Sequence, residues 1–269
     1  MPRRTPLLAL ASPLRPQPYR RTFGASARAP STARRAVVCL LAAVIWFVAL
    51  PTLAPAADRP TLYVFLQTDA KATVFEKALQ QGLPGLTVTV FGRFRDFEEA
   101  FASKRPDAVL VLQPLLVAKG LSATLRGVSK GEDSERFVLV SAGAALAGPL
   151  SNRVIGAVDV LGRKDTHGFV AGLLKTPDVK TKLVTKLEDL LSLLQFSAAD
   201  AILLPAGAVK TFTERSRLSL FVRELPDARV GRASVAVLSP GASTTVVSQI
   251  QGLNRATNEL VGVDGWRCR

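Results

Sequence analysis

The feature that most constrains the fold is a series of short apolar runs with little alternation, each followed by a turn or a polar signal. These runs are Leu62–Leu66, Ala108–Leu112, Phe137–Val140, Val154–Val160, Ala201–Leu204 and Ser234–Leu238. Strands that are apolar on both faces belong to mostly parallel sheets covered by helices. Two further segments, Leu86–Phe91 and Leu218–Val222, alternate more clearly and are also predicted to be strands.

Helical patterns fill the gaps between these runs. The predicted helical segments are the stripe Phe94, Phe97 and Phe101, the stripe Leu183, Leu187, Leu190, Leu191 and Leu194, and the shorter Val74–Leu79, Ala208–Arg215 and Thr245–Leu253. Strand, helix, strand order with short connections predicts an α/β protein with a doubly wound sheet. The number of strands and a stretch rich in small residues, Ser141–Asn152, divide it into two lobes with a cleft between them.

The first 57 residues are predicted to lie outside the fold, because eight arginines without an acidic residue precede the apolar run Ala36–Leu50. The small residues Ala54–Ala56 follow, and this order is typical of a secretory signal peptide. The apolar run is shorter than the ~20 residues of a spanning helix, which favours cleavage and a periplasmic protein. An uncleaved segment would instead act as a membrane anchor.

The strongly basic composition does not indicate a nucleic-acid partner. The formal charge is +14, but the eight leader arginines account for more than half of it and leave +6 for the exported part. Its basic residues are scattered among acids such as Glu98–Glu99 and Glu132–Asp133, without a basic stripe interleaved with aromatic residues. A mildly basic exported domain instead suits a solvated surface or anionic solutes.

The two cysteines exclude a disulfide framework. Cys39 lies in the leader, so Cys268 is alone in the exported part. With one histidine and a single cysteine there, a zinc site is not expected, and no cofactor is predicted.

The main candidate site lies in Val154–Leu174, where an apolar run is followed by the polar loop Gly162–Gly168. This loop is predicted to open a helix over Phe169–Leu174. A strand, loop and helix entry of this kind aims free backbone N–H groups into a cleft.

Four residues of this loop are candidate ligand contacts. Asp165 or Thr166 can cap the helix, and Gly168 allows a ligand to approach the backbone closely. His167 is the only histidine of the chain, and Arg163–Lys164 place positive charge at the positive end of the helix dipole. An anionic ligand is therefore favoured, although a capped helix entry without a ligand explains the same pattern.

Four more candidates follow other predicted strands, where ligands bind in doubly wound sheets. They are Thr68 and Asp69 after the first strand, Gln113 after the third, and Ser141 after the fourth. Ordinary turn chemistry, including Asp69 as a helix cap, explains each of them equally well.

Four stretches together resemble a known family. They are the export signal followed by Leu62–Leu66, the segment Val154–Phe169, the segment Leu187–Leu204, and the tail Leu260–Trp266 with the sequence LVGVDGW. They resemble the extracytoplasmic solute-binding proteins of ABC transporters, with the type 2 periplasmic-binding fold, nearest the phosphate/phosphonate-type subgroup. In that subgroup a hydroxyl-rich Ser/Thr-Ser-Gly-aromatic loop stands where this chain has Asp165–Phe169.

The resemblance implies two lobes joined by two crossing strands, with a ligand held between them and closure of the lobes over it. Carried over, the first lobe is 58–145 completed by 235–269, and the second is 146–234. The crossing strands are expected near Phe137–Val140 and Ala233–Leu238. The implied partners are a small-molecule solute and an ABC permease in the inner membrane.

We therefore expect a monomeric, exported solute-binding protein and not an enzyme, with an anion among the candidate solutes. One alternative is a binding-protein-like sensor or scaffold without a transport role. The other is an exported hydrolase, for which the single histidine has no evident nucleophile partner in the sequence.

Overall fold

A computed structural model of the chain describes residues 59–68 and 71–269. Contacts within the chain separate two units, Met1–Ala56 and Ala57–Arg269, and all described residues belong to the second. The predicted leader and signal peptide, and the candidate Asp69, lie outside the described residues.

The first sheet has six strands in the spatial order β11-β4-β10-β3-β1-β2. Their bounds are β1 Thr61–Phe65, β2 Thr87–Val90, β3 Ala108–Leu112, β4 Leu125–Val128, β10 Ala233–Val237 and β11 Gly265–Cys268. Strands β1, β2 and β3 run parallel, whereas β10 runs antiparallel to both β3 and β4, and β11 antiparallel to β4. We call this sheet and its helices the first lobe.

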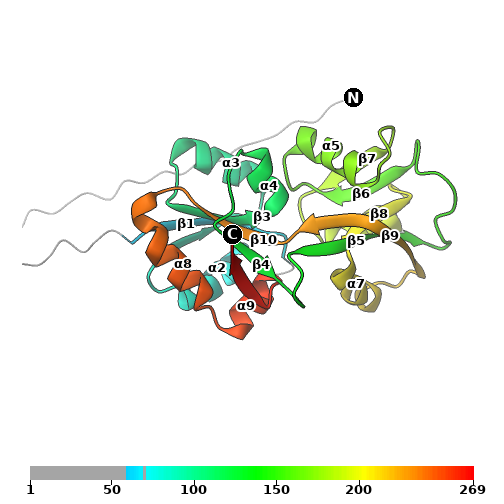
Figure 1. The fold of residues 1–269 in the computed structure, drawn as a ribbon. Helices are drawn as coiled ribbons and strands as arrows, with labels where there is room; N and C mark the ends of the chain where they lie inside the picture. Colours follow the sequence, from blue (N-terminus) through cyan, green and yellow to red (C-terminus); the bar gives the residue numbers. More distant parts are fainter. Residues whose placement is uncertain (1–58, 69–70) are drawn as a thin grey trace, which may run out of the picture. The chain divides into compact units, whose positions relative to one another are not determined.

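The second sheet has five strands in the spatial order β7-β6-β8-β5-β9. Their bounds are β5 Ser134–Ala142, β6 Val154–Val158, β7 Lys180–Val184, β8 Ala201–Pro205 and β9 Leu220–Gly231. Strands β6, β7 and β8 run parallel, whereas β5 runs antiparallel to β8 and to β9. We call this sheet and its helices the second lobe; Figure 1 shows the strands of the first lobe on its left and those of the second lobe on its right.

Helices cover both faces of each sheet. In the first lobe they are α2 Ala72–Gly82, α3 Phe94–Ser103, α4 Gln113–Ala118, α8 Ser243–Gln251 and α9 Arg255–Val261. In the second lobe they are α5 Arg163–Leu173, α6 Asp189–Gln195 and α7 Val209–Arg215, and short 3₁₀ turns occupy Ala206–Ala208 and Pro240–Ala242.

This two-sided covering explains the apolar runs. In β1, Leu62 and Val64 pack with α2 and α8 in one cluster, whereas Phe65 packs with α3 and α4 in another. In β5, Val140 faces α6 and Leu139 faces α5. Since each face of both sheets is buried, neither face of a central strand needs polar side chains. The predicted two-lobed α/β fold is confirmed.

Two segments carry the chain between the sheets. The first is the turn between β4 and β5, and the second is Arg232, between β9 and β10. The sheet therefore changes before β5 and not near residue 145, and Phe137–Val140 lies wholly within the second sheet. On return it changes at Arg232, next to the expected 234/235 boundary.

The directions of the strands place the loops. Strand β10 leads away from the crossing segments, so β1 and β3, which run the other way, end at the seam between the lobes. Likewise β5 leads away from the crossing, so β6 and β8 end at the seam. The carboxyl ends of the parallel strands of both lobes thus border the seam, where this class of sheet binds ligands.

Some predicted elements differ from the structure. Leu183, assigned to a helical stripe, lies in β7, and the helix over that stripe, α6, begins at Asp189. The polar loop Gly162–Gly168 is short, because α5 already begins at Arg163. Strands β4, β7 and β11 were not predicted from the sequence; they are edge or short strands without an apolar run.

Within the described residues, no helix is both long and apolar enough to cross a membrane. In the same residues, no group of three or more histidine, cysteine, aspartate or glutamate side chains is placed to hold a metal ion.

Candidate functional site

The described residues enclose three spaces along the seam between the lobes, and Gln67, just after β1, borders all three. They are an inner apolar cavity, an outer groove and a cavity next to the crossing segments, which we call the hinge cavity. Because they share lining residues, they form one region of the molecule.

The inner cavity is too small for a solute. Its volume is about 30 Å³, and apart from Gln67 its lining consists of apolar residues. That volume accommodates roughly one or two water molecules. Side chains of the protein itself occupy the deep part of the seam.

The reason for this small cavity is apolar packing across the seam. Val160 and Leu161, which follow β6, belong to the same buried cluster as Phe65, Phe94 and Phe97 of the first lobe. Phe94 and Phe97 begin α3, so the end of β6 rests on the start of α3. Contact between the lobes here is made by hydrocarbon groups, and separating them exposes that surface to water.

The outer groove is larger, with a volume of about 380 Å³. From the first lobe it is lined by the residues that follow β1 and β2 and by the starts of α2 and α3. From the second lobe it is lined by residues 185–188, between β7 and α6. Its volume falls within the usual ~300–1,000 Å³ of small-molecule sites.

Two basic residues stand at the helix starts in this groove. Lys71 is the N-cap of α2 and Arg93 the N-cap of α3, and neither helix has a side-chain cap. Free N–H groups of both helices therefore face the groove with the positive ends of the helix dipoles. Within the described residues, no carboxylate pairs with Lys71 or Arg93, whereas Lys186 in the second lobe pairs with Glu188 at 3.3 Å.

One groove carboxylate offsets part of this charge. Asp96 lies in the first turn of α3 and lines the groove. With Lys186 and Glu188 paired to each other, the remaining charged side chains among the described lining residues are Lys71, Arg93 and Asp96. These described residues give the groove lining a net positive charge.

The entry to α5, the main predicted site, is arranged differently. The N-cap is Gly162, with φ 87°, and neither Asp165 nor Thr166 caps the helix. A Cβ atom at Gly162 would lie 2.8 Å from Cε1 of Phe94, so this turn touches the first lobe closely. The expectation that Asp165 or Thr166 is the cap is wrong, because the helix begins before them.

Thr166 is completely buried, and its hydroxyl is used within the loop. Its Oγ1 donates to Oδ1 of Asp159 at 2.8 Å and accepts from the backbone N–H of Leu161 at 2.9 Å. These bonds hold the turn between β6 and α5 and use one donor and one acceptor of the hydroxyl.

The neighbours of Thr166 lie on the surface of α5. Asp165, His167 and Gly168 are exposed, and none of them lines the three spaces of the seam. Nδ1 of His167 lies 2.9 Å from Oγ1 of Thr181 in β7, the outer strand of the second sheet. The structure thus brings the α5 candidates together with one another but not with the groove.

The remaining candidates lie in three different places. Thr68 lines the outer groove. Gln113 begins α4 with its side chain against Gly231, the last residue of β9. Ser141 does not face the seam, because β5 runs antiparallel to β8 and ends at the far edge; its hydroxyl donates to the carbonyl of Ala144 at 2.7 Å.

Sequence reasoning missed the two residues that most distinguish the groove, Lys71 and Arg93. Arg93 comes directly before the predicted stripe that starts at Phe94, Lys71 comes three residues before the predicted helix Val74–Leu79, and no side chain caps either helix. A basic residue where Ser, Thr, Asp or Asn is usual was the available signal.

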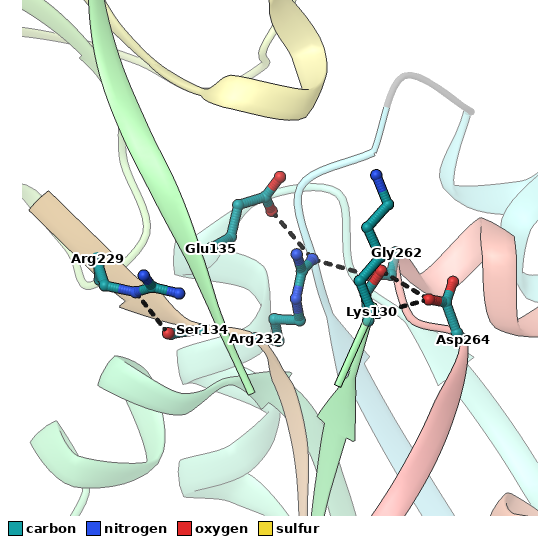
Figure 2. Close-up of polar contacts among 8 residues, drawn as sticks. Lys130, Ser134, Glu135, Arg229, Arg232, Gly262 and Asp264 are labelled. Atoms are coloured by element: carbon teal, nitrogen blue, oxygen red, sulfur yellow. Dashed lines mark hydrogen bonds and ion pairs between the residues drawn. The ribbon is translucent and has the colours of Figure 1, made fainter. Parts of the chain in front are cut away.

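The crossing segments carry a dense polar network, shown in Figure 2. Arg229 donates to Glu132 at 2.7 Å and to Ser134 at 3.0 Å, and Arg232 pairs with Glu135 at 3.3 Å. Asp264, which precedes β11, accepts from the backbone N–H of Lys130 at 2.8 Å in the turn between β4 and β5. The bonds from Lys130 and from the Ser129 hydroxyl hold the pKa of Asp264 below its ordinary value.

The turn between β4 and β5 contains a Gly-x-Ser-x-Gly sequence, Gly127–Gly131. In many hydrolases this pattern surrounds the nucleophilic serine and forms a sharp turn called the nucleophile elbow. A hydrolase elbow leads from a strand into a helix and needs a histidine beside its serine. Here the turn leads from β4 into β5, and the Ser129 hydroxyl donates to Asp264 at 2.9 Å. The chain's single histidine contacts Thr181 instead, so the serine has no histidine beside it.

No protein-family model matches the chain, and neither does any curated protein sequence. Solved structures do match. XAC2383 from Xanthomonas citri bound to ATP has a TM-score of 0.57 at 12% identity, covering 78% of this chain and 91% of that one. AbpA from Streptococcus pneumoniae, a substrate-binding protein of an amino acid ABC transporter bound to L-arginine, has a TM-score of 0.53 at 15% identity, covering 76% and 93%.

A third match is the GluR0 ligand-binding core in complex with L-glutamate, with a TM-score of 0.51 at 14% identity and coverage of 77% of this chain and 98% of that one. The chain has the type 2 periplasmic-binding fold. Because the sequence identities are so low, the similarity to these three structures concerns the fold alone. It covers most of each of the three chains. It does not single out the phosphate/phosphonate-type subgroup.

Proposed function

We propose that this chain is an exported solute-binding protein that captures a small anionic solute in the outer groove and delivers it to an ABC permease. The observation that carries the proposal is the groove itself, a space of about 380 Å³ between the lobes, at the carboxyl ends of parallel strands. Export follows the prediction made from the leader, and closure of the lobes would couple capture to recognition by the permease.

The sign of the solute's charge follows from the groove's own groups. Two helix starts without side-chain caps, and two cations without a carboxylate partner among the described residues, face one space. Both features favour an anion, since the helix dipole and the ammonium or guanidinium groups act in the same direction. Thr68, from the predicted set, lies in the same lining.

The solved relatives of the fold do not decide the solute. One is bound to ATP, one to L-glutamate and one to L-arginine, so the same architecture holds ligands of opposite charge. The phosphate/phosphonate resemblance depended on residues Asp165–Phe169, and these lie outside the groove lining. We therefore base the proposal on the charge of the groove and not on that subgroup.

A ligand screen tests the proposal directly. The purified chain would be melted with inorganic phosphate, ATP, L-glutamate or L-arginine, each over a range of concentrations. A ligand present at 100 times its Kd stabilises the folded state by about 2.7 kcal/mol. We expect at least one anion to raise the melting temperature and L-arginine not to; stabilisation by L-arginine alone would contradict an anion site.

A pair of double variants locates the binding. Lys71→Gln with Arg93→Gln removes both groove cations, and Lys77→Gln with Arg95→Gln removes two exposed cations from the same helices outside the groove. Both doubles change the net charge equally. We expect at least a tenfold loss of anion affinity, about 1.4 kcal/mol, in the first double only. Equal losses in both would mean that binding follows overall charge.

A binding-protein-like scaffold or sensor without a transport role is the second candidate. The observation that favours it is the apolar cluster across the seam, in which Leu161 packs among Phe65 and Phe94. Opening the lobes exposes this surface, so a transport cycle works against the hydrophobic effect. A chain that binds none of the four probes and keeps its lobes in contact would support the scaffold.

A further inference from the structure

One side chain contacts both lobes at the crossing. Arg232 lies between β9 of the second sheet and β10 of the first. Its Nη1 atom donates to Oε2 of Glu135, in β5 of the second lobe, at 3.3 Å. The same atom donates to the carbonyl oxygen of Gly262, which follows α9 of the first lobe, at 3.1 Å. Figure 2 shows the guanidinium between these two acceptors.

The hydrogen bonds made by the terminal nitrogen Nη1 hold this guanidinium in position. The side chain of Arg232 is 16% exposed, and its Nε atom is buried without a hydrogen-bond partner. A buried donor without an acceptor is unfavourable, so bonds at Nη1 must compensate for it. Gly262 has φ 80°, a left-handed conformation that ends α9 where its carbonyl meets Arg232.

Rotation of the lobes cannot preserve both bonds. The backbone turns at residues 129–133 and at Arg232, so opening moves Glu135 with one lobe and Gly262 with the other. A single nitrogen can follow only one of them. The two bonds therefore belong to the arrangement in which the lobes are in contact.

The other hinge arginines differ in this respect. Arg229 bonds Glu132 in the first crossing segment and Ser134 at the start of β5, and its side chain is 43% exposed. Arg126 pairs with Asp133 at 3.3 Å, with its side chain 35% exposed. Neither reaches a group in each lobe. Arg232 and Glu135 are the most buried of these pairs, so salt screens them least.

We propose that Arg232 is a positioning residue that sets the balance between open and closed lobes, without touching the solute. Through Glu135 and Gly262 it stabilises the closed arrangement, in which the outer groove has both its walls. A protein whose binding-competent state is less populated binds more weakly by that fraction. The inference concerns the hinge and does not depend on which solute the groove takes.

The experiment measures the distance between the lobes. Spin labels are attached at Lys77→Cys in α2 and Lys182→Cys in β7, both exposed positions. Double electron–electron resonance then measures the distance between the labels, which increases when the lobes open. The full chain also carries Cys39→Ser and Cys268→Ser, since these are its only cysteines. We compare Arg232→Gln with Arg229→Gln, because Arg229 lies only three residues away, near the end of β9.

The expected result is a longer distance for Arg232→Gln, with the open fraction raised about tenfold, because a hydrogen bond to a charged group is lost. Arg229→Gln should keep the distance distribution of the parent chain, even if its melting temperature falls. A purely structural role would lower both melting temperatures and leave both distance distributions unchanged.

Two further variants test whether misfolding of Arg232→Gln could explain a longer distance between the lobes. Glu135→Gln removes only the second-lobe acceptor's charge and should open the lobes part of the way. Arg232→Lys keeps the charge and should restore part of the closed population. Unchanged distances in Arg232→Gln and Glu135→Gln would overturn the proposal, as would equal opening in Arg229→Gln.

Discussion

The start of α5 and the starts of α2 and α3 look alike in the sequence but differ in the structure. All three follow strands that end at the seam, and each has basic residues at or just inside its first turn. At α5 the buried Thr166 bonds Asp159 and the turn rests on Phe94. At α2 and α3 no side chain caps the helix, and the N-terminal groups face a space of about 380 Å³.

The difference shows that a helix entry becomes a ligand site only when its own chain leaves it open. Thr166 provides a hydroxyl, as a solute site would, but both of its hydrogen bonds go to neighbouring residues. Lys71 and Arg93 are a poor choice for helix caps, and their basic side chains instead add charge to the groove. Four predictions test this contrast.

Replacing Thr166 by valine should have the largest effect. The change keeps the shape of the side chain and leaves Asp159 and the N–H of Leu161 without their partner. We expect a loss of about 2–3 kcal/mol in the free energy of unfolding, measured by denaturant titration. Anion affinity should stay the same.

Thr73→Val, at an exposed threonine of α2, is the control and should change stability by less than about 0.5 kcal/mol. If Thr166→Val were as stable as the parent protein but bound the anion more weakly, the ligand site would lie at the start of α5 and not at the starts of α2 and α3.

Acid should weaken the stabilising contribution of a carboxylate that is bonded by the backbone. The backbone N–H of Thr61 donates to Asp107 at 2.8 Å, and this bond, followed by the Ser239 hydroxyl, holds the pKa of Asp107 below its ordinary value. Asp107→Asn should therefore lose about 1 kcal/mol at pH 7.

The direction of the pH dependence follows from the linkage between protonation of Asp107 and folding. A lowered pKa stabilises the fold above the unfolded pKa of about 3.9, and the contribution is lost as the pH falls through the folded pKa. The difference between parent and Asp107→Asn should thus close below about pH 4. A difference between parent and Asp107→Asn that is as large in acid as at pH 7 would refute this assignment.

Giving α2 a conventional cap should exchange binding for stability. Lys71 has φ −60° and ψ 138°, an extended conformation suited to a cap. Lys71→Asp should raise the free energy of unfolding by about 1 kcal/mol while weakening anion affinity at least tenfold. Thermal melts and calorimetric titration would measure the two effects. A variant that is more stable and still binds the anion would remove α2 from the site.

Gly168→Ala should have the smallest effect. A Cβ atom there has no neighbour within 4 Å, and the residue lies inside α5. Alanine should therefore stabilise the protein by about 0.5 kcal/mol, because glycine loses more backbone entropy in a helix.

Gly168→Ala and His167→Ala should both bind the anion as the parent does, since both residues lie on the outer surface of α5. Weaker binding in either variant would support the original loop site.

The apolar runs predicted most of both sheets because burial on two faces leaves a signal in consecutive residues. Runs such as Ala108–Leu112 and Ala201–Leu204 became β3 and β8. Lys180–Val184 left no such signal, because β7 is an edge strand with lysines on its exposed side. Leu183 was assigned to a helix because its neighbours at 187, 190 and 194 continue a helical spacing.

The site was harder to predict, and Ser141 shows why. A residue after an apolar run lies at a cleft only if that strand is parallel to its neighbours, and β5 is antiparallel to β8. Strand direction follows from which segments pair, and pairing joins residues far apart in the chain. Gln113 ends a strand of the right direction, yet its side chain packs on Gly231 across the crossing.

The sequence by itself determined the α/β class and the positions of the buried strands, because the hydrophobic effect acts on each residue where it stands. Only the tertiary structure decided which helix starts remain open, since Phe94 must meet Gly162 before α5 is covered. It likewise brought Arg232 between Glu135 and Gly262, residues far apart along the chain. The local sequence around such groups does not indicate their hydrogen-bond partners, because only the fold brings them within hydrogen-bonding distance.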